Sequence, residues 1–123
     1  NIGHITDSRI NNAKFFDNEL SKVKNIRLPI RPKNSKQVFH LYIIMVEQRD
    51  NLIKYLISKG IDAKIHYPVP MHLQPAAKEY NYKKGDFPIT EEIAETAISL
   101  PVHEFIKEDQ RRYVVKQIKN FFK

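Results

Sequence analysis

The amino-acid sequence predicts an α/β domain in which helices alternate with a small number of strands. Residues 37–46 are mostly apolar on both faces, a pattern typical of a strand that is covered on both sides. Residues 61–67 alternate apolar and polar side chains, which predicts a half-buried strand. The segment between them has helical spacing, and the resulting β-α-β order by itself favours a parallel pair of strands.

Four segments carry the apolar spacing of amphipathic helices: residues 8–23, 50–59, 90–98 and 108–122. Their expected N-terminal caps include Thr6 or Asp7 for the first and Thr90 for the third. Gly60 is expected at the left-handed C-cap of the second helix. The side chains expected to face the core are Ile10, Ala13, Phe16, Leu20 and Val23, then Leu52, Ile53, Leu56 and Ile57, then Ile93, Ala94, Ala97 and Ile98, and finally Val114, Val115, Ile118, Phe121 and Phe122.

A chain of 123 residues has the length of a single domain. Its prolines divide this domain into segments and do not mark a second domain. Pro29 and Pro32 keep their neighbourhood extended, so residues 1–32 are expected to form a leading helix and connector. Residues 33–123 then form the α/β body. A short helix is expected at residues 74–80, and an edge strand at residues 99–103 because Pro101 cannot donate to a sheet.

The most distinctive stretch of the sequence is residues 65–76, IHYPVPMHLQPA. Two prolines end the preceding strand and stiffen the turn that follows, so that His72 and Gln74 are held in fixed directions. The alternation places His66 on the polar face of the strand and Tyr67 on the apolar face, where Tyr67 is expected in the core. Rigid polar groups just past a strand end are a common way to build a ligand site.

Composition excludes several classes of function. The chain has no cysteine, which excludes disulfides and a cysteine nucleophile, and its histidines have no spacing typical of metal ligands. The net charge of +7 is scattered along the chain rather than gathered in a basic stripe, so we expect no nucleic-acid partner. With no membrane-span or signal-peptide pattern, a cytoplasmic protein is expected.

Three blocks of the sequence together resemble the DegT/DnrJ/EryC1/StrS family of pyridoxal-phosphate-dependent nucleotide-sugar aminotransferases. One block is Gly60–Ile61 followed by residues 65–76, and a second runs from residues 82–88 through Glu92 to residues 99–101. The third is the leading helix followed by Leu28–Pro29 and the segment Phe39–Tyr42. The resemblance extends from about Arg9 to Phe122 and is specific because the three blocks occur in the same order.

The resemblance implies that this chain is the C-terminal small domain of a longer enzyme of the aspartate-aminotransferase fold. It implies a sheet of three or four mainly antiparallel strands with helices packed on one face, and we follow it over the parallel pair. The cofactor-bearing N-terminal large domain, which would be the packing partner of this chain, is expected to be absent here together with the lysine that binds pyridoxal phosphate. We therefore expect no catalytic residue and no metal in this segment.

The resemblance also implies which side chains contact the nucleotide-linked sugar: His66 and Tyr67, and in the second half of the motif His72 and Gln74. The complete enzyme would be a homodimer that moves an amino group, usually from glutamate, to a keto nucleotide sugar. Two alternatives stay open. The chain could be a free-standing binding or regulatory domain, or it could belong to the branch of the family that dehydrates sugars.

Overall fold

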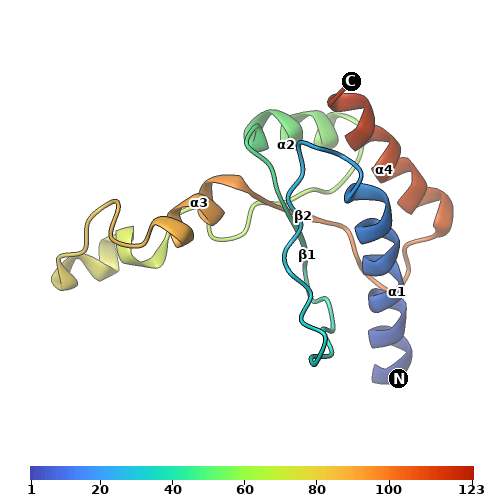
Figure 1. Ribbon diagram of the computed structural model, residues 1–123, viewed down its shortest axis with the longest axis horizontal. Coiled ribbons are helices and arrows are strands. Elements are labelled where there is room, and N and C mark those ends of the chain that lie inside the picture. Colours follow the sequence, from blue (N-terminus) through green and yellow to red (C-terminus); the bar gives the residue numbers. More distant parts are fainter.

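The computed structural model describes residues 1–123 as a body of helices and sheet from which one long arm projects (Figure 1). Along the chain the body contains α1 (Ile2–Leu20), β1 (Tyr42–Met45), α2 (Arg49–Ser58), β2 (Ala97–Leu100) and α4 (Glu108–Phe121). We call residues 67–92 the arm. It contains the short 3₁₀ helices η1 (Met71–Leu73) and η2 (Pro75–Tyr80) and the start of α3 (Pro88–Thr96).

The sheet consists of β1 and β2, which pair antiparallel with Tyr42 opposite Leu100 and Ile44 opposite Ile98. Single antiparallel bridges extend it on both edges, Arg27 to Met45 and Lys64 to Ser99. The antiparallel arrangement expected from the family resemblance is confirmed, and the parallel pair that the β-α-β order favoured is wrong. The regular sheet has two strands rather than three or four.

One face of this sheet carries the core. Tyr42, Ile44, Ile98 and Leu100 point to that face and join a cluster of 17 buried apolar residues. Helices α1, α2 and α4 contribute eight more members, including Phe16, Leu56 and Ile118, and the connecting segments contribute Ile26, Val46, Ile61, Ala63 and Val102. The packing of these helices on one face is therefore confirmed, and it follows from the amphipathic spacing of each helix.

A buried polar contact ties the leading helix to the strand and to the connector. The hydroxyl of Tyr42 donates to Asp17 Oδ1 at 2.8 Å, and Arg31 donates Nε and Nη2 to the same carboxylate at 3.1 and 3.0 Å. Burial and the neighbouring Asp17 carboxylate raise the pKa of the Tyr42 phenol far above its ordinary value. The contact fixes the connector against α1, next to the core.

The strand predicted at residues 37–46 is wrong in length and in burial, since β1 begins at Tyr42. Phe39 has a φ of 52°, which no strand accommodates, and Val38 is exposed. Along β1 buried and half-buried residues alternate, so only one face is covered. The strand predicted at residues 61–67 is reduced to one bridge at Lys64, although Ile61 and Ala63 point into the core as expected.

Helix ends also differ from the expectations. Helix α1 begins at Ile2 rather than Ser8, because no proline or glycine cap interrupts residues 4–8. Helix α3 begins at Pro88, a residue suited to the first helical position, and not after Thr90. The segment predicted as its end, Ala97–Ile98, instead pairs with β1, so tertiary pairing overrides the helical spacing.

Several local predictions are confirmed. Helix α4 spans Glu108–Phe121 and buries Val114, Val115 and Ile118. Gly60 and Gly85 both have positive φ angles, and Pro75 opens the short helix η2. Ile57 and Ile93, however, are exposed, because α2 and α3 each bury a narrower stripe than their sequences predicted. None of the helices is both long enough and apolar enough to cross a membrane.

Candidate functional site

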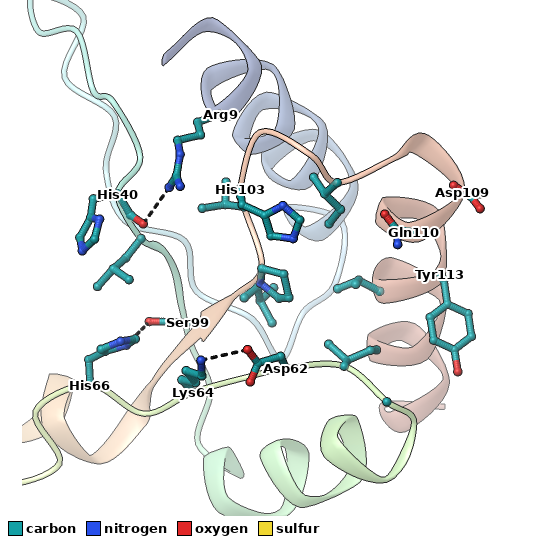
Figure 2. Close-up of a pocket in the computed structure, with 18 residues that line it drawn as sticks. Arg9, His40, Asp62, Lys64, His66, Ser99, His103, Asp109, Gln110 and Tyr113 are labelled. Atoms are coloured by element: carbon teal, nitrogen blue, oxygen red, sulfur yellow. Dashed lines mark hydrogen bonds and ion pairs between the residues drawn. The ribbon is translucent and has the colours of Figure 1, made fainter. Parts of the chain in front are cut away.

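A cleft of about 810 Å³ opens on the body between the start of β1, the segment after α2, the end of β2 and the start of α4 (Figure 2). Three histidines line it: His40, His66 and His103. They come from three separate segments: Arg9 of α1 holds the carbonyl of His40, Lys64 bridges the segment of His66 to β2, and His103 lies in the segment that follows β2. The cleft therefore collects imidazole groups that are far apart in sequence.

His66 has a fixed position in the wall of this cleft. Its Nδ1 lies 2.9 Å from the hydroxyl oxygen of Ser99 on β2 (Figure 2). Ser99 is buried, and its backbone exchanges two hydrogen bonds with Lys64, two residues before His66. The backbone bridge and the side-chain contact thus hold the same short segment against the edge of the sheet.

The charged groups of the cleft are mostly paired with one another. Arg9 donates to the carbonyl oxygens of Phe39 and His40 and forms an ion pair with Glu104 at 3.2 Å. The backbone N–H of Glu104 lowers its own pKa, burial opposes this, and Arg9 lowers it further. Lys64 pairs with Asp62 at 2.9 Å. The polar groups left for a ligand are therefore the histidine rings and the carboxylate of Asp109, which lines the cleft without a hydrogen bond or ion pair to the protein.

Tyr67 follows His66 and points away from the protein. Its side chain is 78% exposed, so the expectation that strand alternation places it in the core is wrong. The backbone explains the change: Tyr67 has a φ of 54°, a conformation that a bulky residue rarely adopts and that costs about 1–2 kcal/mol. The positive φ ends the alternation one residue before Pro68 and turns the aromatic ring outward.

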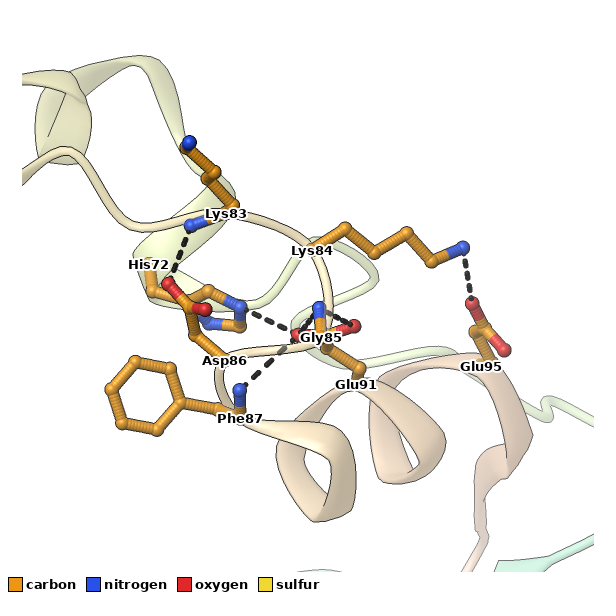
Figure 3. A network of polar contacts seen from close by, with 8 residues as sticks. All are labelled: His72, Lys83, Lys84, Gly85, Asp86, Phe87, Glu91 and Glu95. Atoms are coloured by element: carbon orange, nitrogen blue, oxygen red, sulfur yellow. Dashed lines mark hydrogen bonds and ion pairs between the residues drawn. The ribbon is translucent and has the colours of Figure 1, made fainter.

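His72 and Gln74 lie in the arm, and both have partners within it. The ring of His72 is almost fully buried, and its Nε2 donates to Glu91 Oε1 at 2.9 Å (Figure 3). Gln74 donates from its side-chain amide to the carbonyl oxygen of Val69 at 3.2 Å, which closes the proline-rich turn. Both side chains therefore shape the arm in this structure.

Glu91 is the centre of the arm. Its carboxylate accepts hydrogen bonds from the backbone N–H of Gly85 at 2.8 Å and of Phe87 at 3.4 Å, in addition to the one from His72 (Figure 3). Burial raises the pKa of Glu91, but these donors lower it by more, so the pKa stays below its ordinary value. Hydrogen bonds to this carboxylate, rather than a cluster of buried apolar side chains, hold this part of the chain together.

Of the four side chains expected to contact a sugar, only His66 lines the cleft, whereas Tyr67 is exposed and His72 and Gln74 are bound within the arm. Sequence reasoning missed Ser99 and Glu91. An acidic residue in the first helical turn, close behind a glycine loop, was a usable signal because such a side chain reaches back to free N–H groups. Ser99 belongs to the second block of the family resemblance, but nothing in the sequence paired it with His66.

Comparison with known proteins gives the family. The model of the DegT/DnrJ/EryC1/StrS aminotransferase family matches residues 1–119. The chain belongs to this family. A relative named pleiotropic regulatory protein from Geobacillus stearothermophilus is 42% identical over 86 residues, which are 70% of this chain and 23% of the relative. A dTDP-3-amino-3,4,6-trideoxy-alpha-D-glucose transaminase from Streptomyces venezuelae is 32% identical over 83% of this chain and 27% of its own length.

Solved structures of family members also superpose on the chain. The crystal structure of DesV from S. venezuelae in complex with a ketimine intermediate matches with a TM-score of 0.92 and 29% identity. The match covers 97% of this chain and 32% of that chain. A DegT/DnrJ/EryC1/StrS aminotransferase from Brucella abortus matches with a TM-score of 0.86 and 28% identity. The chain thus spans about a quarter to a third of the length of its relatives.

The lysines of this family member do not provide a place for pyridoxal phosphate. A lysine that binds this cofactor covalently needs a desolvated setting. Every lysine of the chain is exposed except Lys119, which is half-buried and paired with Glu19 at 2.7 Å. The one lysine of the cleft, Lys64, is exposed and paired with Asp62. No group of three histidine or acidic residues comes together as a metal site.

Proposed function

We propose that this chain is the C-terminal small domain of a pyridoxal-phosphate-dependent aminotransferase that acts on a keto nucleotide sugar. The single observation that carries the proposal is the match, over 97% of this chain, to the crystal structure of DesV in complex with a ketimine intermediate. The relatives named as dTDP-sugar transaminases support the substrate class. Glutamate is the proposed amino donor.

The cofactor is proposed to be held by the other part of the enzyme, because no lysine of this chain is desolvated. The role of this domain is then to bind and orient the sugar. His66 is the first candidate, since its ring is fixed at Nδ1 and the residue lines the cleft. A histidine nitrogen there forms a hydrogen bond with a sugar hydroxyl or a phosphate oxygen.

Tyr67 is the second candidate. Its exposure and its strained backbone are both unfavourable for a structural residue, and strained residues cluster at functional sites. We propose that Tyr67 contacts the substrate or the large domain when the enzyme is complete. We propose that His72 and Gln74 act by fixing the conformation of the arm. Only the resemblance of the motif supports a contact between these two side chains and the sugar.

The large domain is the proposed partner of the arm. Large apolar side chains are exposed along it: Tyr67, Val69, Met71, Tyr80, Tyr82, Phe87 and Ile89. Exposed large apolar side chains that are this frequent along one segment favour a contact face there. We propose that the large domain, in a homodimeric enzyme, covers this face.

Two other functions compete with this proposal. One relative, the pleiotropic regulatory protein, has a regulatory name, but the match spans only 23% of it, so it supports a regulatory role and not a free-standing domain. The dehydratase branch of the family would use the same small domain. The lysine position of the large domain separates these cases, because a lysine there supports the aminotransferase and a histidine supports the dehydratase.

The test is the kinetics of the complete enzyme with His66→Ala. The value of kcat/KM for the nucleotide sugar is expected to fall roughly ten- to a hundredfold, the loss of one good hydrogen bond to substrate. The glutamate half-reaction is expected to change much less, because the small donor does not extend as far. The control is His4→Ala, which removes an exposed histidine outside the cleft. An unchanged kcat/KM for the sugar contradicts the role of His66.

The isolated chain provides a second test. Mixed with pyridoxal phosphate and borohydride, it is expected to show no stoichiometric labelling of a single lysine. Labelling of one lysine at a 1:1 ratio would place the cofactor in this chain and contradict the proposal.

A further inference from the structure

Ser99 makes an interaction that the family resemblance did not point to. Its hydroxyl lies 2.9 Å from His66 Nδ1, and it has no other hydrogen-bond partner in the structure. Ser99 lines the cleft but is only 6% exposed as a residue, so little of it is in contact with water. The position of the serine is fixed by β2, where its N–H donates to the Lys64 carbonyl at 2.8 Å and its carbonyl accepts from Lys64 N at 3.0 Å.

The burial of the hydroxyl decides the direction of the hydrogen bond. If His66 Nδ1 carried the proton and donated it, the hydroxyl hydrogen of Ser99 would have no acceptor. A buried donor without a partner costs free energy, whereas an oxygen acceptor left with one lone pair free costs less. The favourable arrangement has the Ser99 hydroxyl donating to Nδ1. In a neutral imidazole the proton then belongs to Nε2.

We propose that Ser99 is a positioning residue that holds His66 as the Nε2–H tautomer in the wall of the cleft. His66 then presents a hydrogen-bond donor, and the group that it recognises must be an acceptor, such as a carbonyl, hydroxyl or phosphate oxygen of the ligand. The assignment to the nucleotide sugar rests on the proposed function, whereas the tautomer itself depends only on this chain.

The surroundings of His66 support a specific effect of Ser99. His40 and His103 line the same cleft, but both are exposed and neither ring forms a hydrogen bond with the protein. Only the ring of His66 is therefore fixed among the three histidines. His40 and His103 serve as internal references for an imidazole that exchanges freely between its tautomers.

The experiment is long-range ¹H–¹⁵N correlation NMR of the histidine rings in the 123-residue chain, at a pH above 8, well above the ordinary pKa of imidazole. In the unsubstituted chain, His66 is expected to show a protonated Nε2 and an unprotonated Nδ1. Ser99→Ala is expected to shift the ¹⁵N chemical shifts of the His66 ring toward the tautomer-averaged chemical shifts of His103. Ser99→Thr keeps the hydroxyl and is expected to restore the original pattern.

Two results would overturn the proposal. One is a protonated Nδ1 on His66 in the unsubstituted chain, a measurement that requires no variant. The other is the same tautomer pattern in Ser99→Ala as in the unsubstituted chain. Ser58→Ala, which removes an exposed serine at the end of α2, is the matched control and leaves the His66 signals unchanged.

Kinetics of the complete enzyme separate this proposal from the proposed function. Ser99→Ala is expected to lower kcat/KM for the nucleotide sugar roughly three- to tenfold, the size of one neutral hydrogen bond, with recovery in Ser99→Thr. If the NMR pattern is as expected and the kinetics do not change, Ser99 still positions His66. The sugar-binding role of His66 is then contradicted.

Discussion

The body of this chain buries 17 apolar residues from its helices, both strands and the segments that connect them, whereas the arm buries only the charged Glu91. In the body, the hydrophobic effect stabilises the fold. Its free energy is proportional to the apolar area that is buried and does not depend on the direction of individual contacts. In the arm, order comes from a carboxylate that satisfies the N–H groups of a loop and a histidine ring. A short segment without an apolar stripe can thus adopt one conformation when a single side chain supplies the acceptors.

The difference matters for the site, because His66 belongs to the body and the second half of its motif belongs to the arm. His66 is anchored to β2 through Ser99, and His72 is anchored to α3 through Glu91. The two halves of the motif therefore have separate supports. A substitution that loosens one half should leave the other in place.

The largest effect is expected from a truncation in the core of the body. Phe16→Ala removes a fully buried ring that packs on Tyr42 at 5.2 Å between centroids. The free energy of unfolding should fall by about 3–5 kcal/mol because a cavity remains. Urea unfolding followed by circular dichroism measures the change. The matched variant in the arm, Phe87→Ala, should lower the free energy of unfolding by less than about 1 kcal/mol. An equal loss of stability in Phe16→Ala and Phe87→Ala would contradict the difference between body and arm.

A smaller effect is expected for Tyr42→Phe, which keeps the buried ring and removes its hydrogen bond to Asp17. The loss should be about 1–2 kcal/mol, since hydrogen bonds to charged groups are stronger than neutral ones. Tyr55→Phe is the control, because the hydroxyl of Tyr55 donates to the neutral Gln117 at 2.9 Å. The loss in Tyr55→Phe should be smaller, and the reverse order would show that charge is not the decisive factor at Tyr42.

The arm should respond to acid through Glu91. Since the pKa of Glu91 is lower in the folded chain than its ordinary value of 4.5, ionised Glu91 stabilises the fold above that value. This stabilisation should decline as the pH falls below about 4.5 and disappear below the folded pKa. Glu19, Glu104 and Glu108 also have lowered pKa values, so the contribution of Glu91 is the difference between the original chain and Glu91→Gln. A difference that does not depend on pH would contradict this assignment.

The smallest effect is expected for polar substitution of the exposed apolar surface of the arm. Ile89→Ser removes a side chain that is 72% exposed, so the free energy of unfolding should change by less than about 0.5 kcal/mol. In the complete enzyme the same substitution should weaken the proposed contact with the large domain. Thermal unfolding of the isolated chain and of the complete enzyme, each with and without the substitution, measures the two effects. A large loss of stability in the isolated chain would place Ile89 in a core.

Much of the body could be predicted from sequence because its helices bury one stripe each. The spacing of Ala13, Phe16 and Leu20 identified the inner face of α1, and the motif blocks indicated an antiparallel sheet. The ends of β1 and β2 could not be predicted, since pairing between residues far apart in sequence decides them. Ala97 and Ile98 have helical spacing with Ile93 and Ala94, yet their pairing with β1 places them in a strand.

The arm could not be predicted for a different reason. Its order depends on the direction of one carboxylate, and no periodic pattern encodes a side chain that reaches back to Gly85 and Phe87. The positive φ of Tyr67 could not be predicted either, because the alternation of apolar and polar residues continues from residue 61 up to that position. His66 was identified by its motif, but its partner Ser99 lies 33 residues away.

Amide hydrogen exchange of the original chain and of Glu91→Gln tests most directly whether the arm and the body have separate supports. Glutamine keeps the size of the side chain and removes the charge, so the amides of Gly85 and Phe87 should lose protection. The amides of Ile44 and Ile98 in the sheet should exchange at the original rate, because their protection depends on the apolar core. Equal loss of protection in the arm and in the sheet would contradict the account, as would unchanged exchange at Gly85 and Phe87.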